Sequence, residues 1–77
     1  MTAPPRSSGP DTRAILHRLG QPLSAILSNA QAARRFLASD RPDLAEVRAA
    51  LSDIVTQSKK AARLFRQLEA RLLRDQS

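Results

Sequence analysis

The stretch Ser39-Asp40-Arg41-Pro42-Asp43 interrupts two long helical patterns near the middle of a 77-residue chain. Pro42 cannot continue a preceding helix, because its ring removes a backbone donor and restricts the residue before it. Asp43 followed by Glu46 is a variant of the capping box that begins helices. The stretch therefore predicts that one helix ends at about Ala38 and that another begins at residue 43.

Apolar residues recur on both sides of this break at alternating steps of three and four. The first stripe comprises Leu16, Leu19, Leu23, Ile26, Ala30, Ala33 and Leu37. The second stripe comprises Leu44, Val47, Leu51, Ile54, Ser58, Ala61, Phe65, Leu68 and Leu72, with Ser58 as its polar member. Such spacing is typical of coiled-coil helices. We predict an all-α fold, an antiparallel two-helix hairpin with helices over about 12–38 and 43–74.

Folding the chain back at Arg41 sets the two stripes against each other. The predicted pairs are Leu37 with Leu44, Ala33 with Val47, Ala30 with Leu51, Ile26 with Ile54, Leu23 with Ser58, Leu19 with Ala61, and Leu16 with Phe65. Leu68 and Leu72 have no mates in this scheme, because a first helix that begins at residue 12 is too short. The second helix should therefore overhang.

A second apolar set flanks the stripes and exceeds what one partner helix can cover. It comprises Ile15, Leu27, Phe36, Ala50, Val55, Ala62, Leu64 and Leu73. Domains below about 70–80 residues usually need a partner or a cross-link to bury enough surface. We expect a homodimeric four-helix bundle rather than a loosely collapsed hairpin. Its dimer and core residues would be Leu16, Leu19, Leu23, Ile26, Leu51, Ile54, Phe65 and Leu68.

Composition narrows the possible partners and the location of the chain. The net charge is +6, from 13 basic and 7 acidic residues, which favours acidic partners. There is no cysteine, and the aromatic residues are two phenylalanines, so neither a thiolate metal site nor a base-stacking platform is expected. The chain has no run of 18 apolar residues and no signal-peptide core, which predicts a cytoplasmic location without a membrane span. Residues 1–10 are rich in Pro, Gly and Ser and predict a disordered leader before a helical domain over 11–77.

His17 is the only histidine and the best candidate for covalent chemistry. At helical spacing it heads a polar face that comprises His17, Gln21, Ser24, Ser28, Gln31 and Arg35. A neutral imidazole on such a face can act as a nucleophile, although an ordinary solvated histidine is the alternative. Pro22 should bend the helix nearby, and Gly20 loosens the same turn. No second His, no Cys and no carboxylate at i+3 or i+4 completes a metal site.

The sequence His17-Arg18-Leu19-Gly20-Gln21-Pro22-Leu23, followed by Ser24 to Ala33, resembles the H-box of bacterial two-component sensor histidine kinases. More narrowly, it resembles the HisKA-like subgroup whose motif reads His-Glu-Leu-Asn-Gln-Pro-Leu. Residues 43–74 resemble the second helix of the same dimerisation and phosphoacceptor domain. The resemblance covers about residues 12–74.

This resemblance implies a homodimeric four-helix bundle in which His17 is the phosphoacceptor. The phosphoryl group would come from ATP held by a separate catalytic domain, in cis or in trans, and pass to an aspartate on a response-regulator receiver domain. Pro22 would make the bend, and Gln21 would help to orient a hydrolytic water. The 77 residues contain no ATP-binding domain and imply no cofactor of their own, so we expect no autophosphorylation by this chain alone.

Two residues depart from the family motif. Arg18 stands where the family usually has an acidic residue that serves as general base, and Gly20 stands where asparagine is usual. A missing base costs about 10²–10⁴-fold in rate. Two functions therefore stay open, a phosphoacceptor module and a catalytically degenerate module that pairs with and modulates a histidine kinase. A basic hairpin that binds nucleic acid is a weaker third possibility, because it rests on charge alone.

Overall fold

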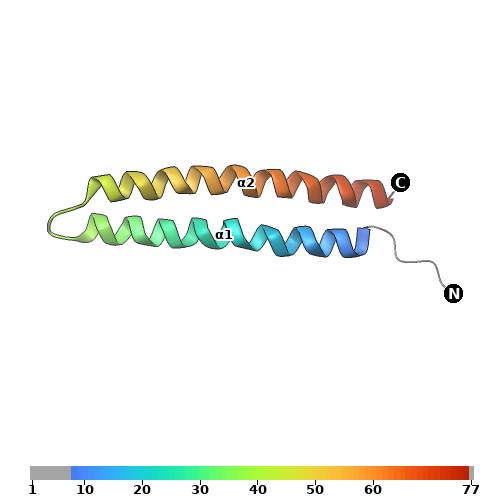
Figure 1. Cartoon of the computed structure of the whole chain (residues 1–77), viewed down its shortest axis with the longest axis horizontal. Coiled ribbons are helices and arrows are strands. Elements are labelled where there is room, and N and C mark those ends of the chain that lie inside the picture. The colour runs from blue at the N-terminus through green and yellow to red at the C-terminus, as the bar shows by residue number, and fades with distance from the viewer. Residues whose placement is uncertain (1–7, 77) are drawn as a thin grey trace.

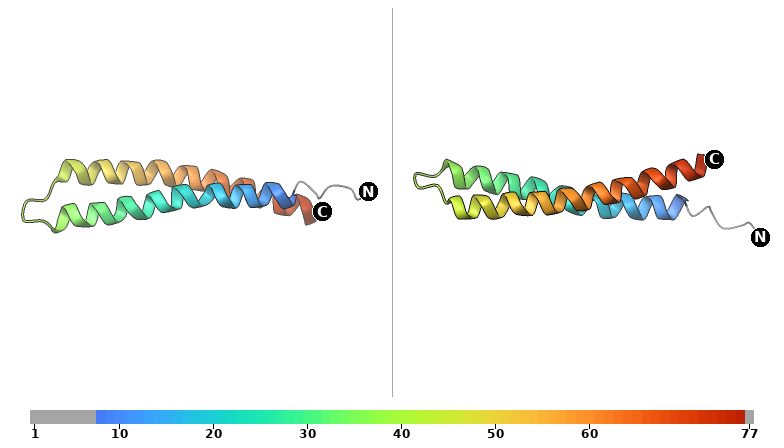
Figure 2. Two further views of the ribbon diagram at one scale, coloured as in Figure 1. Left: turned by 60° about the horizontal axis from the view of Figure 1, so that its bottom comes forward. Right: turned by 90° about the horizontal axis from the view of Figure 1, so that it is seen from above.

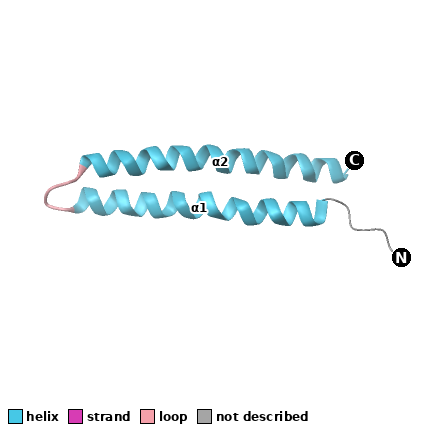
Figure 3. Cartoon of the chain, viewed as in Figure 1, coloured by secondary structure: helices cyan, strands magenta, loops and turns pink. Residues whose placement is uncertain are grey.

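The computed structural model describes residues 8–76, with side chains over 12–74. Two helices, α1 (Ser8–Ala38) and α2 (Leu44–Gln76), lie side by side and antiparallel, so the ends of the described chain meet at one end of the rod (Figures 1 and 2). Apart from the connection at 39–43, every described residue is helical (Figure 3). The prediction of an all-α antiparallel hairpin is confirmed. No described helix is long and apolar enough to cross a membrane.

The connection at 39–43 is held by local hydrogen bonds. The Ser39 hydroxyl lies 3.3 Å from the carbonyl oxygen of Phe36, in the last turn of α1, and 2.9 Å from that of Arg41. Asp43 caps α2, because its Oδ1 accepts the backbone N–H of Glu46 at 3.1 Å and its carbonyl accepts that of Val47 at 3.0 Å. These bonds satisfy groups that helix ends leave free. The predicted break and cap are confirmed.

The start of the first helix differs from the prediction. α1 begins at Ser8, four residues before residue 12, and so includes Pro10. The first four N–H groups of a helix have no intrahelical partner, so a proline in that turn sacrifices no hydrogen bond. α2 extends to Gln76, two residues past the predicted end. Residues 1–7 of the predicted disordered leader lie outside the described residues.

The faces that pack together are rotated relative to the predicted stripes. One buried cluster comprises Ile15, Leu64 and Leu68 with Leu19 against it, and the other comprises Ala33, Val47 and Ala50 with Phe36 against it. Alternate members of each predicted stripe are therefore correct: Leu19, Ile26 and Ala33 on α1, and Val47, Ile54, Ala61 and Leu68 on α2. In the other half of each stripe, the residue one position earlier faces the partner helix: Ile15 replaces Leu16, Phe36 replaces Leu37, Ala50 replaces Leu51, and Leu64 replaces Phe65.

The predicted pairs Leu16 with Phe65 and Leu37 with Leu44 are wrong as core pairs, because all four side chains are 51–55% exposed. Conversely, four residues of the predicted flanking set, Ile15, Phe36, Ala50 and Leu64, pack between the helices. Two overlapping stripes with the same spacing exist on each helix and share every second member. The observed stripes contain Pro22 and Ala50, where the predicted stripes contain Leu23 and Leu51. The smaller residues allow the two backbones to approach more closely.

Two further expectations concern Leu68 and Pro22. Leu68 does have partners, since it is buried against Ile15 and Leu64. Ile15 lies inside the predicted helix over 12–38, so this contact comes from the rotated face of α1 and not from its earlier start. α1 also continues through Pro22, whose side chain is fully buried. Pro22 removes the N–H that would bond to the carbonyl of Arg18 without ending the helix, and the bend that it should produce stays a prediction.

Candidate functional site

His17 lies on the outer face of α1. It comes two residues after buried Ile15, so its side chain leaves the helix on the side away from α2, and it is exposed. The whole predicted polar face is exposed: His17, Gln21, Ser24, Ser28, Gln31 and Arg35. The imidazole is therefore open to a second protein without any movement of the hairpin.

The neighbours of His17 on the helix surface are the residues three and four positions away. Arg13 and Gln21 lie one turn before and one turn after it, and both are exposed. At i+3, a Cβ added to Gly20 would meet no atom within 4 Å. The surface of α1 is therefore open at Gly20, one turn after His17.

Arg18 leaves α1 about 100° around the helix axis from His17. Only the end of a long side chain at position 18 can therefore approach the imidazole. Arg18 lies two turns before Ala25, whose carbonyl oxygen accepts a 2.8 Å hydrogen bond from Asn29 Nδ2. Arg18 therefore emerges on the flank of the hairpin that carries Asn29. No carboxylate stands one turn from His17 on α1, since those positions hold Arg13, Ala14, Gly20 and Gln21.

Asn29 also links the two helices. Its Nδ2 donates a 2.6 Å hydrogen bond to Asp53 Oδ2 of α2. His17 lies twelve residues before Asn29, and Phe65 lies twelve residues after Asp53. Because the helices are antiparallel, His17 and Phe65 lie at the same level of the hairpin. The contact of Ile15 with Leu64 gives nearly the same alignment. The apolar spacing did not predict this pair, and its one signal in the sequence is an asparagine directly before Ala30, a predicted core residue.

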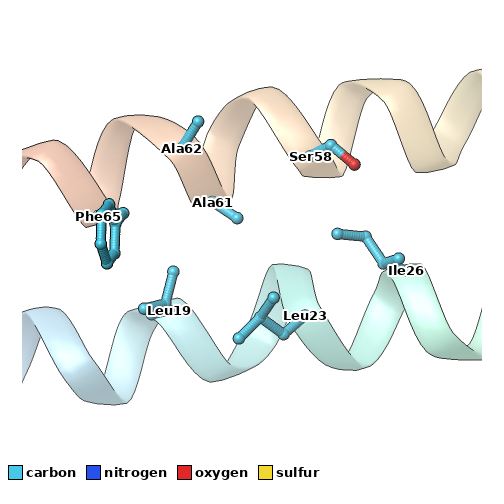
Figure 4. Close-up of a pocket in the computed structure, with 7 residues that line it drawn as sticks. All are labelled: Leu19, Leu23, Ile26, Ser58, Ala61, Ala62 and Phe65. Atoms are coloured by element: carbon cyan, nitrogen blue, oxygen red, sulfur yellow. The ribbon is translucent and has the colours of Figure 1, made fainter.

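The opposite flank is apolar. Leu19, Leu23 and Ile26 of α1 and Ser58, Ala61, Ala62 and Phe65 of α2 line an open groove of about 390 Å³. The side chains of Leu19, Ile26 and Phe65 project into the space between the helices (Figure 4). Residues at steps of seven positions, or two helical turns, before and after the groove residues Leu23 and Phe65 extend this flank along both helices. We call it the apolar flank, and it comprises Leu16, Leu23 and Leu37 of α1 with Leu44, Leu51, Phe65 and Leu72 of α2.

The predicted dimer and core residues divide between the core and this flank. Leu68 is buried, and Leu19, Ile26 and Ile54 are partly buried between the helices. Leu16, Leu23, Leu51 and Phe65 are each about half exposed, at 51–52%. Among the described residues, no three His, Cys, Asp or Glu side chains gather in a way that could hold a metal ion.

Most of the hairpin matches part of a larger curated protein. Over 60 residues, the chain is 38% identical to the sensor histidine kinase TmoS of Ectopseudomonas mendocina. The hairpin is related to part of a sensor histidine kinase. The match covers 78% of this chain but only 6% of the relative, so it relates one module and not the whole kinase. No family model and no solved structure matches the chain.

Proposed function

We propose that this kinase-related hairpin is a phosphoacceptor and dimerisation module of two-component signalling. His17 takes a phosphoryl group from ATP bound to a separate catalytic domain and passes it to an aspartate of a response-regulator receiver domain. The observation that carries the proposal is the exposed imidazole beside the open surface at Gly20, on the outer face of α1. Because ATP supplies the phosphoryl group, the module works in the cytoplasm.

The chemistry requires one unprotonated imidazole nitrogen. Its lone pair forms the N–P bond to the γ-phosphorus while the bond from that phosphorus to the bridging oxygen breaks and ADP leaves. The imidazolium that results loses the proton from its other nitrogen. A neighbouring base would accept that proton, but Arg18 has no acceptor atom. The transfer should therefore be slow unless the partner domain supplies a base.

A second copy of the hairpin is the occupant we propose for the apolar flank. Seven large apolar residues line it, and none of them is buried by the hairpin itself. Apposing two such flanks would bury all seven from each copy, at about 25 cal/mol per Å² of apolar surface. The outer face with His17 points away from α2, so it would stay accessible in the resulting four-helix bundle.

The decisive experiment mixes the purified chain with ATP and the catalytic domain of a related sensor histidine kinase. We expect acid-labile, base-stable label on the chain that disappears in His17→Gln. Label that persists in His17→Gln would place the modification elsewhere and contradict the proposal. A folded dimer that never labels, with several catalytic domains tried, would also contradict it.

A degenerate module that pairs with and modulates a histidine kinase is the second candidate. Arg18 favours it, because the position next to the histidine offers no base and no carboxylate stands one turn away on α1. The apolar flank would serve this role equally well. The two candidates differ in whether His17 carries phosphate when the base is restored at position 18.

A further inference from the structure

The positive charge of the hairpin is concentrated at one end. The loop half, residues 27–53, contains four basic and four acidic residues and is neutral. The open half, residues 8–26 and 54–76, contains eight basic and three acidic residues and carries +5. His17 lies in this basic half. The uneven distribution is a property of the folded hairpin, because it joins segments from both ends of the sequence.

Within the open half, three cations occupy the flank opposite the apolar one. Lys60 comes two helical turns after Asp53, and Arg18 comes two turns before Ala25. Since Asn29 bonds to both Asp53 and Ala25, Lys60 and Arg18 emerge on the flank that carries this bond. Arg63 lies one turn after Lys60 and two residues before Phe65, the residue level with His17. We call Arg18, Lys60 and Arg63 the basic face, and all three are exposed.

Among the side chains that the structure describes, over 12–74, no unbonded carboxylate lies within two turns of Lys60 on this flank. Asp53 lies two turns before Lys60 on the same flank of α2, and its carboxylate already accepts a hydrogen bond from Asn29. Two turns after Lys60 the position is Gln67. Three cations that converge from two helices repel one another, and an anionic surface that binds there relieves this repulsion. The basic face also lies away from the apolar flank, so dimerisation through that flank leaves it accessible.

We propose that the basic face is a docking surface for a partner protein with an acidic surface. An acidic protein fits better than nucleic acid for two reasons. The positive charge covers only half of a helix that is about 50 Å long, and a duplex along the rod would meet Asp40, Asp43, Glu46 and Asp53 in the neutral half. The face also has no aromatic side chain on which the bases of a single strand could stack.

The test measures fluorescence anisotropy with two probes, labelled decaglutamate and a DNA duplex of about 20 base pairs. The chain is compared with Lys60→Glu/Arg63→Glu and with Arg41→Glu/Arg48→Glu, a matched control in the loop half with the same change of charge. Circular dichroism verifies that each variant keeps its helix content. Neither double variant changes His17 or Arg18, so this binding measurement can fail without contradicting the phosphorylation experiment, and the reverse also holds.

We expect the chain to bind decaglutamate more tightly than the duplex. This binding should weaken as the salt concentration rises from about 50 to 300 mM. Lys60→Glu/Arg63→Glu should lower the affinity about tenfold or more, and the control less than about threefold. Equal losses in both variants would show a diffuse effect of net charge and overturn the proposal. Tighter binding of the duplex would assign the face to nucleic acid, and binding of neither probe would also overturn the proposal.

Discussion

Asn29 and Asp53 join α1 and α2 through a 2.6 Å hydrogen bond between Nδ2 and Oδ2. Nδ2 has two hydrogens, and the other is donated to the Ala25 carbonyl, so both donors are used. A polar pair at one level of an otherwise apolar contact fixes the register, because sliding by one turn would separate it. That register places His17 level with the basic half of α2.

The first prediction concerns this pair. Asn29→Ala and Asp53→Ala should each lower the free energy of unfolding by about 1 kcal/mol, since the bond is partly open to solvent. A double-mutant cycle in urea should give a coupling energy of about 0.5–1 kcal/mol. Ser28→Ala, on the outer polar face, is the neutral control. Coupling near zero would mean that the pair does not set the register.

The second prediction tests the rotated packing. Ala50 faces α1, whereas its neighbour Ala49 is exposed. Ala50→Leu should lower the stability by about 1–3 kcal/mol, because the added atoms force the helices apart. Ala49→Leu should be nearly neutral. Thermal unfolding at one fixed concentration compares the two variants, and equal effects would favour the stripe that was predicted from spacing alone.

The third prediction concerns the apolar flank. Leu51→Glu should convert a dimer into a monomer at tens of micromolar, because burying an unpaired carboxylate in the interface is costly. Thr56→Glu adds the same charge at an exposed position on the same helix and should leave the dimer intact. Sedimentation velocity distinguishes the species. A chain that is a folded monomer before any substitution would contradict the proposed dimer.

The fourth prediction concerns Gly20. The structure places it in α1 without a positive φ, and an added Cβ would meet no atom within 4 Å. Gly20→Ala should therefore raise the free energy of unfolding by about 0.5–1 kcal/mol, since it restricts the unfolded chain without a clash. Chemical denaturation measures the gain. A loss of stability would show that the space beside His17 is filled in solution.

The fifth prediction concerns Arg18 and decides between the two candidate functions. With ATP and a related catalytic domain, the natural chain should label weakly, and Arg18→Glu should label faster by about 10²–10⁴-fold, because the carboxylate can accept the imidazole proton. Arg18→Gln controls for the loss of positive charge. If the natural chain labels as fast as Arg18→Glu, Arg18 is no obstacle. If neither chain labels and both stay folded, the interaction-only module is favoured.

Local signals along the chain determined most of the architecture. Pro42 and Asp43 act within one helical turn, through a missing donor and a side-chain cap, so they marked the break and the start of α2 without knowledge of the fold. Alternation of polar and apolar residues likewise placed His17 and Gln21 on an exposed face. The Pro, Gly and Ser content of residues 1–10 predicted a disordered leader and not the start of α1 at Ser8, although the first turn of a helix tolerates a proline such as Pro10.

The tertiary structure alone decided which side of each helix faces the other. Steps of three and four describe two overlapping stripes on one helix, and Leu16 and Ile15 satisfy the pattern equally well. The choice depends on how closely two backbones can approach, which is a property of both helices together. Ile15, Ala33 and Ala50 therefore lie in the core, while Leu16, Leu51 and Phe65 form an apolar flank. The bond between Asn29 and Asp53 has the same origin, since residues 24 positions apart meet only when the hairpin closes.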